Sequence, residues 1–553
     1  MADDGNDLAT RTRHWAMRLT RQPSVNGTDD EAALGAWLSD ALGNSKTFGD
    51  QVAVWTIPVA PGDRRECVAL FVPGSGRRTV LLTGHFDTVA IDDYGDLRGV
   101  ATDPDLLLQA LTDRLSARAE TPAERRAKAD FASGEYLPGR GLLDMKAGLA
   151  AGLAVMERFA AGKAASGNLL FIAVPDEENA SAGARRAAPA LVEIAADRGL
   201  DLVAAINLDA IADDGDGSAG RAIALGTVGK LLPTAFVAGV PAHGGFPFNG
   251  VNAAALIAAI ALRLEWAPEL TDDGAAQPGT PPSLLSLRDG KSGYDVTTPG
   301  TAFATWNVLT HRRSPEEVLR IFEQLCVEAA TSCLEELAHR AAASTLPEGR
   351  TAAAGKIHHY RYEEIREAAE RKSPGFAKKL RELGVKLGSS GLPLPEQCRR
   401  VTERVWRESR LAGPAIVTGF GSIPYLSTQL SSSSEARRLD ATVRAAAAAS
   451  QDRYGTSVTC TEYFAGISDM SFFGEADEAS LDIVERNTPV WKDSVAWPEG
   501  RASGMIPVVN IGPWGRDYHT PLERLHTGYG FNVLPRLLFD VVVAVLDIEA
   551  STS

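Results

Sequence analysis

The stretch RRTVLLTGHFDTV, residues 77–89, decides the fold. It follows the turn sequence PGSG and consists of β-branched and leucine residues up to His85, which predicts a buried strand. Similar apolar runs at residues 168–174, 202–208 and 506–511 predict three further strands, and helical patterns at 146–161 and 184–196 separate the first three. Strands that alternate with helices predict an α/β fold built on a doubly wound, mostly parallel sheet.

The 553 residues exceed what one hydrophobic core usually serves, so we expect more than one folding unit. Strand patterns at 234–240 and 301–310 and helical patterns at 251–264 and from Ser314 predict an inserted α+β domain. The predicted division is a first catalytic part at 1–225, the inserted lid or dimerisation domain at 226–345, its charged helical extension without strands at 346–400, and a second catalytic part at 401–553.

Composition and charge exclude several classes of function. The net charge of −15 would repel a phosphate backbone, so nucleic acid is not an expected partner. No apolar stretch reaches the length of a membrane span, and the N-terminus lacks the pattern of an export signal, which predicts a cytoplasmic protein without a membrane partner. Five scattered cysteines without CxxC spacing argue against a disulfide framework and a thiolate metal site.

Histidine and acidic side chains gather where the predicted strands end, which is where ligands bind in sheets of this type. His85 and Asp87 follow the first strand and share a face, and Asp144 lies in a glycine-flanked loop before a helix. Taken singly, each motif has a plain alternative: a hydrogen-bonded histidine, a helix cap or a solvated acidic turn. Together they offer a mixed nitrogen and oxygen ligand set that suits zinc, cobalt or manganese. The remaining candidates are Glu177, Glu178, Asp209 and His519.

The ordered segments GHFDTV, GRGLLDMKAG, PDEE, the strand end at Asp209 and GRDYHTPLE resemble those of a family of dinuclear zinc peptidases. This family includes acetylornithine deacetylase, succinyl-diaminopimelate desuccinylase, carboxypeptidase G and aminoacylase, and the chain looks closest to its RocB-type arginine-utilisation subgroup. His526 is an alternative to His519, which we prefer because a glutamate, Glu523, follows it four residues later. The resemblance implies two zinc-type ions, the first held by His85, Asp144 and Asp209 and the second by Asp144, Glu178 and His519.

The resemblance also implies roles beyond the metal ligands. Glu177 would be the general base, Asp87 would orient His85, and a cis peptide bond would follow Asp144. In the inserted domain, His243 matches a lid histidine that reaches the partner subunit's active site, and Asn252 matches a nearby lid asparagine, which implies a homodimer formed through this domain. The family's substrate-gripping Asp-x-Arg is replaced by Thr310-His311-Arg312-Arg313, where Arg312 or Arg313 could bind a substrate carboxylate or both could be surface residues.

These features predict a hydrolase that cleaves the amide bond of an N-acyl amino acid or short peptide, a small-molecule or peptide substrate. A hydroxide that bridges the two metals would attack the carbonyl, with Glu177 moving the proton to the leaving amine. The alternative is a catalytically retired relative that serves as a binding or regulatory protein, although every expected ligand and the base are present. Deacylase, carboxypeptidase and aminopeptidase activities remain open.

Overall fold

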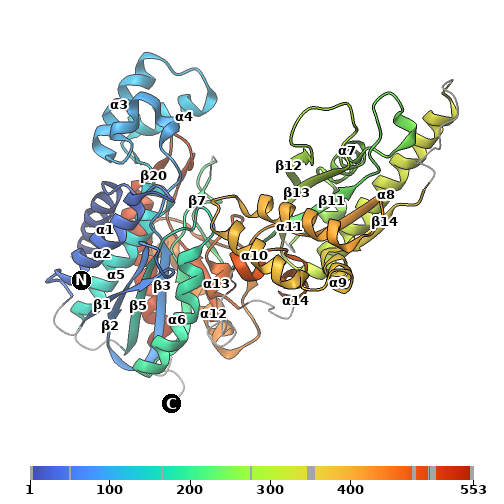
Figure 1. Cartoon of the computed structure of the whole chain (residues 1–553). Helices are drawn as coiled ribbons and strands as arrows, with labels where there is room; N and C mark the ends of the chain where they lie inside the picture. Colours follow the sequence, from blue (N-terminus) through green and yellow to red (C-terminus); the bar gives the residue numbers. More distant parts are fainter. Residues whose placement is uncertain are drawn as a thin grey trace. The chain divides into compact units, whose positions relative to one another are not determined.

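The computed structural model describes residues 4–48, 52–162, 166–213, 215–274, 277–344, 355–475, 481–495, 497 and 506–547. The chain divides into two compact units (Figure 1). The first unit comprises residues 1–227, 428–476 and 498–553, and the second comprises 228–427 and 477–497. The second unit therefore lies within the first along the sequence, as an insertion.

The first unit is built on an eight-stranded mixed sheet. Its strands, in spatial order, are β1 (Ala53–Pro58), β2 (Glu66–Val72), β5 (Ser166–Val174), β3 (Ser75–His85), β6 (Asp201–Asn207), β18 (Val508–Ile511), β8 (Ala222–Ala224) and β17 (Thr459–Thr461). The four predicted strands, β5, β3, β6 and β18, form its parallel centre. The α/β prediction is thus confirmed, with antiparallel pairings added towards both edges.

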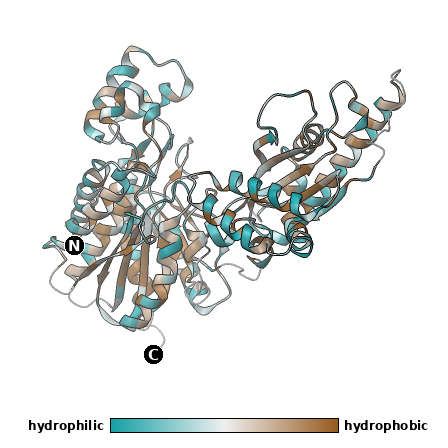
Figure 2. Ribbon diagram, in the orientation of Figure 1, coloured by the Kyte–Doolittle hydropathy of each residue, from teal (hydrophilic) through white to brown (hydrophobic). Residues whose placement is uncertain are grey.

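Helices cover both faces of this sheet. Helices α5, α15, α1 and α2 share one core with the inward side chains of β2, β3 and β5, and α6 packs on the other face against β1, β2 and β5. In Figure 2 the central strands are brown, which marks them as apolar. The helices of this unit are α1 (Asp4–Thr20), α2 (Asp29–Gly43), α3 (Pro104–Ala117), α4 (Pro122–Ser133), α5 (Ala147–Ala161), α6 (Ala182–Arg198), α12 (Ser434–Tyr454), α13 (Met470–Phe473) and α15 (Leu534–Leu546).

The segment Gly528–Leu546, which contains α15, is long and apolar enough to cross a membrane by length and composition alone. However, 67% of its most apolar window is buried inside the protein, where α15 packs against α5, β3 and β5. We therefore assign its apolar character to the core of the first unit.

A small four-stranded sheet accompanies the main sheet in the first unit. It has the order β4 (Tyr136–Pro138), β20 (Arg524–His526), β19 (Trp514–Arg516) and β7 (Ile211–Ala212). Helices α3 and α4 pack on β4. A helical turn at Leu142–Lys146 lies next to β20 and leads into α5. A further pair, β9 (Gly226–Thr227) and β16 (Thr428–Gln429), lies where the chain leaves and re-enters this unit.

The second unit contains a six-stranded sheet and six α-helices among its described residues. Its strands are β10 (Gly229–Leu231), β13 (Thr301–Thr310), β11 (Pro233–Ala238), β15 (Ala415–Phe420) and β14 (His358–Arg361), with β12 (Ser283–Asp289) also paired to β13. Its helices are α7 (Ala253–Leu264), α8 (Pro315–Ala342), α9 (Tyr362–Lys372), α10 (Phe376–Gly388), α11 (Leu394–Ser409) and α14 (Leu481–Asn487). Helices α7 and α8 pack together, and α9 to α11 pack with the sheet in one core.

Three details of the predicted division differ from the structure. The segment 346–400, which was expected to lack strands, contains β14. The backbone of His358–Arg361 forms hydrogen bonds with β15 in a parallel pairing, and no local sequence pattern predicts this tertiary contact. The return to the first unit occurs at Thr428 rather than at residue 401, because β15 pairs with β11 inside the second sheet. Residues 477–497 also return to the second unit, where α14 contacts β15 and α9.

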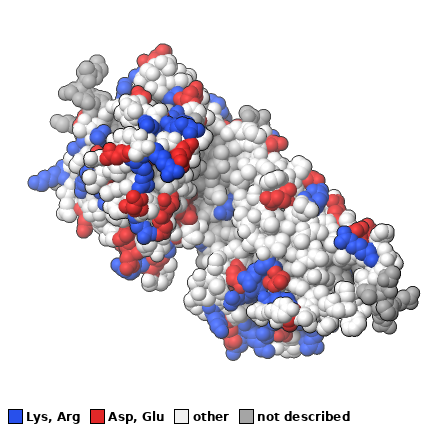
Figure 3. Space-filling view, turned by 90° about the horizontal axis from the view of Figure 1, so that it is seen from above, with Lys and Arg blue, Asp and Glu red and all other residues white. Residues whose placement is uncertain are grey.

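Charged side chains of both signs lie side by side on the face shown in Figure 3. The same mixture occurs along α11, where Arg404 pairs with Glu408 and Arg407 with Glu403, one helical turn apart. Such pairs balance the positive charges of this helix locally.

Candidate metal centre

Six predicted site residues come together at one edge of the main sheet. His85 is the last residue of β3, Glu177 and Glu178 follow β5, and Asp209 follows β6. Because these strands are parallel neighbours, their carboxyl ends open on the same side. Asp144 reaches this place from the turn before α5, and His519 from the loop between β19 and β20. The Asp144–Met145 peptide bond is cis, as predicted.

The side chains form two groups that share Asp144. His85 Nε2 lies 3.1 Å from Asp144 Oδ1 and 3.8 Å from Asp209 Oδ1. His519 Nε2 lies 3.1 Å from Asp144 Oδ2 and 3.2 Å from Glu178 Oε1. In each group the potential ligand atoms lie within 4.8 Å of one another. Ligands around a tetrahedral zinc ion are about 3.3 Å apart, so both groups have the spacing and the donor types that a divalent cation requires.

The electrostatics of the cluster favour a bound cation. Burial raises the pKa of Glu177 well above its ordinary value, and burial also raises the pKa of Glu178 and of Asp209. Burial alone would lower the pKa of His519, but hydrogen bonds with Asp144 and Glu178 raise it to about 10. Four largely buried carboxylates thus face two histidines, of which His85 is buried and His519 exposed, and divalent cations would offset this excess of negative charge.

Asp87 organises the site differently from the prediction that its carboxylate orients His85. The main-chain oxygen of Asp87 lies 3.1 Å from His85 Nδ1, whereas its carboxylate Oδ1 is 3.6 Å away. The carboxylate instead accepts hydrogen bonds from the main-chain N–H groups of Glu177 and Glu178, each at 3.1 Å. One buried aspartate therefore fixes the histidine through its backbone and the two glutamates through its side chain.

A second layer of residues supports Asp87 and was not predicted. The amide of Asn26 donates to Asp87 at 3.0 Å and to Asp176 at 3.2 Å. Asp176 is buried, has a left-handed backbone (φ 71°) and accepts a hydrogen bond from Arg65 at 2.5 Å. The position of Asp176 directly before Glu177 was the one available signal in the sequence, because Asn26 and Arg65 lie far from the motif.

The remaining predicted residues lie elsewhere. The ring of His526 packs against Trp514, with centroids 4.7 Å apart, and its Nδ1 accepts the N–H of Tyr529, so the structure does not bring it into the cluster. His243 belongs to the second unit, where its Nδ1 accepts the N–H of Gly245. Asn252, also in that unit, caps α7 through its side-chain oxygen.

The arginine turn of the second unit is held by an aspartate from another segment. Asp272 Oδ2 accepts the main-chain N–H groups of His311, Arg312 and Arg313 at 2.8 to 2.9 Å. The guanidinium of Arg313 donates to the main-chain oxygen of Glu269. The turn is therefore fixed by its backbone, and Arg313 has a structural partner.

Comparison with known proteins identifies the family. Residues 119–488 match Peptidase family M20/M25/M40, and because this match covers more than half of the chain, the protein belongs to that family. The chain is 29% identical to the uncharacterized protein YqjN of Bacillus subtilis over 532 residues, covering 96% of this chain and 95% of YqjN. It is 27% identical to protein RocB of the same organism over 562 residues, covering 97% and 95% of the two chains.

Solved structures share the fold of this chain. A tripeptidase from Staphylococcus aureus matches with a TM-score of 0.54 at 15% identity, covering 97% of this chain and 98% of its own. The aminopeptidase PepT from Bacillus cereus matches with a TM-score of 0.53 at 13% identity and the same coverage. The protein is accordingly a member of a family of divalent-metal hydrolases that act on peptides or acyl amino acids.

The Asn26→Ala substitution is expected to weaken metal binding roughly 10- to 100-fold, because the lost amide supports the aspartate that holds Glu177 and Glu178. Competition with a chelator measures the affinity. Asn44→Ala is the matched control, since Asn44 is exposed and its amide donates to Asp40 O at the end of α2. Equal affinities in the two variants would show that Asn26 does not support the site.

Proposed function

We propose that the protein is a dinuclear, zinc-dependent hydrolase that cleaves the amide bond of an N-acyl amino acid or a short peptide. The observation that carries this proposal is the pair of ligand groups that share Asp144, one oxygen of which faces His85 and the other His519. His85, Asp144 and Asp209 would hold one ion, and Asp144, Glu178 and His519 the other. Cobalt or manganese would suit the same ligands.

Glu177 has the position and environment of a general base. Its Oε2 lies 4.0 Å from His85 Nε2, beside the ligands, and its burial raises the pKa of the carboxyl group, which increases its affinity for a proton. The bound ions would lower the pKa of a water molecule and polarise the substrate carbonyl. Glu177 takes the proton from this water and delivers it to the nitrogen of the leaving amine. The new C–O bond would form first and give a tetrahedral oxyanion; the C–N bond would then break as Glu177 protonates the nitrogen, which leaves a carboxylate and a free amine.

We propose that residues of the second unit recognise the substrate. Of the two arginines in the turn, Arg312 is our candidate for binding a substrate carboxylate, because a guanidinium can bind a carboxylate through two parallel hydrogen bonds. As the family resemblance implies, His243 is proposed as a hydrogen-bond donor to the oxyanion in the active site of the partner subunit, and Asn252 as a residue near the substrate. We also propose a cytoplasmic protein with a place in amino-acid or arginine utilisation, as the sequence and its resemblance to the RocB-type subgroup imply.

The test combines metal analysis with a substrate panel. Mass spectrometry of the purified protein should find about two divalent ions per chain. The panel contains N-acyl amino acids, including N-acyl arginine, and di- and tripeptides with free amines, so that deacylase and aminopeptidase activities give different results. Turnover of one class supports the proposal and names the substrate. Bound metal without any turnover would favour a binding or regulatory role, and absence of metal under metal-replete conditions would refute the site.

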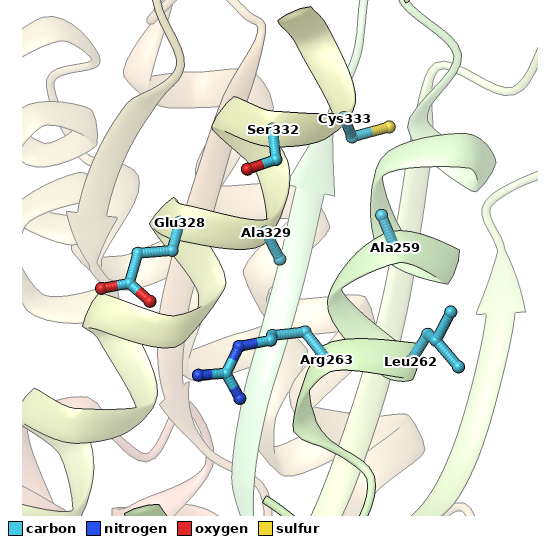
Figure 4. A pocket seen from close by; sticks show the side chains of 7 residues that line it. All are labelled: Ala259, Leu262, Arg263, Glu328, Ala329, Ser332 and Cys333. Carbon is cyan, nitrogen blue, oxygen red and sulfur yellow. The ribbon is translucent and has the colours of Figure 1, made fainter. Parts of the chain in front are cut away.

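The second unit also carries apolar surface suited to a homodimer. Leu262 of α7 and Leu285 of β12 are 84% and 58% exposed, and Leu287 and Trp266 are exposed nearby in the sequence. A groove of about 620 Å³ lies between α7 and α8 (Figure 4). Its lining residues are Ala259, Leu262, Arg263, Glu328, Ala329, Ser332 and Cys333. We propose that a second copy of the chain covers this face.

Leu262→Glu is expected to convert the dimer to a monomer, because it places a charge in a surface that must lose its water on association. Light scattering coupled to size-exclusion chromatography measures the mass in solution. Leu106→Glu is the matched control, since Leu106 of α3 is 53% exposed in the first unit. A wild-type protein that is already monomeric, or a dimer that survives Leu262→Glu, contradicts this interface.

A further inference from the structure

The loop that carries His519 needs support from outside itself. It connects β19 to β20 and contains two non-glycine residues with left-handed backbones, Asp517 (φ 53°) and His519 (φ 61°). His519 is exposed, whereas His85 is buried at the end of a central strand. The two histidines of the cluster therefore differ in how firmly their local structure holds them.

The support comes from Asp130, near the end of α4. Its carboxylate accepts two hydrogen bonds from the guanidinium of Arg516, the last residue of β19, at 2.7 and 2.8 Å. The same carboxylate also accepts a hydrogen bond from the guanidinium of Arg524, the first residue of β20, at 2.8 Å. Arg524 is completely buried and reaches back into the loop, where it donates to Asp517 at 2.6 Å. One aspartate thus joins both strands at the base of the His519 loop.

The other side of the loop is attached to the segment that carries Asp144. Glu523 accepts the main-chain N–H of Gly141 at 2.9 Å and pairs with buried Arg140 at 2.8 Å. Because Gly141 begins the turn that contains Asp144, this contact fixes the loop relative to the shared ligand. A displacement of the β19–β20 hairpin would therefore reach His519 first, because His85 is the last residue of β3 and Asp209, which follows β6, is held by two hydrogen bonds with Asn510 of β18.

We propose that Asp130 is a positioning residue for the second metal ion, the one assigned to Asp144, Glu178 and His519. This inference rests on the proposed function. It makes the helical pair α3 and α4 a structural part of the metal centre, because α4 supplies the charge that holds the loop. If Asp130 loses its charge, the buried guanidinium of Arg524 has less negative charge beside it to balance its own. The β19–β20 hairpin must then shift so that water can reach this guanidinium. The first ion has no ligand in this hairpin.

The test measures the affinity of each ion in Asp130→Asn by titration of the metal-free protein with zinc. We expect the second ion to bind roughly 10- to 100-fold more weakly than in the wild type, with the first unchanged. Asp113→Asn, an exposed change in α3, is the matched control and should bind both ions normally. Thermal unfolding of each variant reports whether the fold is intact.

The outcomes separate this inference from the proposed function. A wild-type protein that binds no metal refutes the proposed function itself. A wild type with two ions and an Asp130→Asn variant with unchanged affinities overturns the inference alone, as does equal weakening of both ions. Should Asp130→Asn fail to fold, Arg516→Met decides the question, since it removes only one of the two guanidiniums; unchanged binding of the second ion in that variant overturns the proposal.

Discussion

Glu177→Gln should lower kcat by about 10²- to 10⁴-fold while both metal ions remain bound. Glutamine has the size of glutamate but cannot accept the proton of the attacking water. Glu177 is assigned to neither ligand group that shares Asp144, so its loss leaves those groups complete. The measurement pairs turnover of the best substrate from the panel with metal content by mass spectrometry on the same sample.

The adjacent Glu178→Gln is the matched control for this prediction. It makes the same chemical change one residue away, but Glu178 lies 3.2 Å from His519 and is assigned to the second ion. We expect this variant to lose about one ion as well as activity. The assignment of the two glutamates would be wrong if Glu177→Gln lost metal and Glu178→Gln retained it, or if Glu177→Gln kept turnover within tenfold of the wild type.

The parts of the fold that the sequence predicts are those with strong local patterns. The central strands β3, β5 and β6 are continuous apolar runs because both of their faces are covered by helices. The edge strand β14 has the sequence HHYR and partly exposed side chains, and it is a strand because β15 pairs with it. Its conformation depends on a tertiary contact, which a local pattern does not contain.

The metal centre also contains residues that the sequence could predict and residues that it could not. Its ligands could be predicted because parallel strands end together, so that histidine and acidic residues after each strand must meet. The supporting residues could not, because each acts through a partner far along the chain. Asn26 is 61 residues from Asp87, and Asp130 is 394 residues from Arg524. Nothing near Asn26 or Asp130 in the sequence distinguishes it from a surface residue.

Asp144→Asn is expected to weaken the binding of both ions by at least about 100-fold, more than the loss of any single supporting residue. Asp144 Oδ1 faces His85 and Oδ2 faces His519, each at 3.1 Å, so both oxygens are committed. Asparagine keeps one oxygen and replaces the other with an NH₂ group, which is a donor and cannot bind a cation. Turnover should fall with metal content, and zinc titration of the metal-free protein measures both affinities.

His519→Ala provides the comparison that makes this prediction specific. It removes a ligand from one group, so it should abolish the second ion and leave the first, which keeps His85, Asp144 and Asp209. Loss of both ions from Asp144→Asn but only one from His519→Ala is the pattern that a shared carboxylate requires. Loss of a single ion from Asp144→Asn would mean that the two groups bind independently, and it would remove the argument for a water molecule held between two cations.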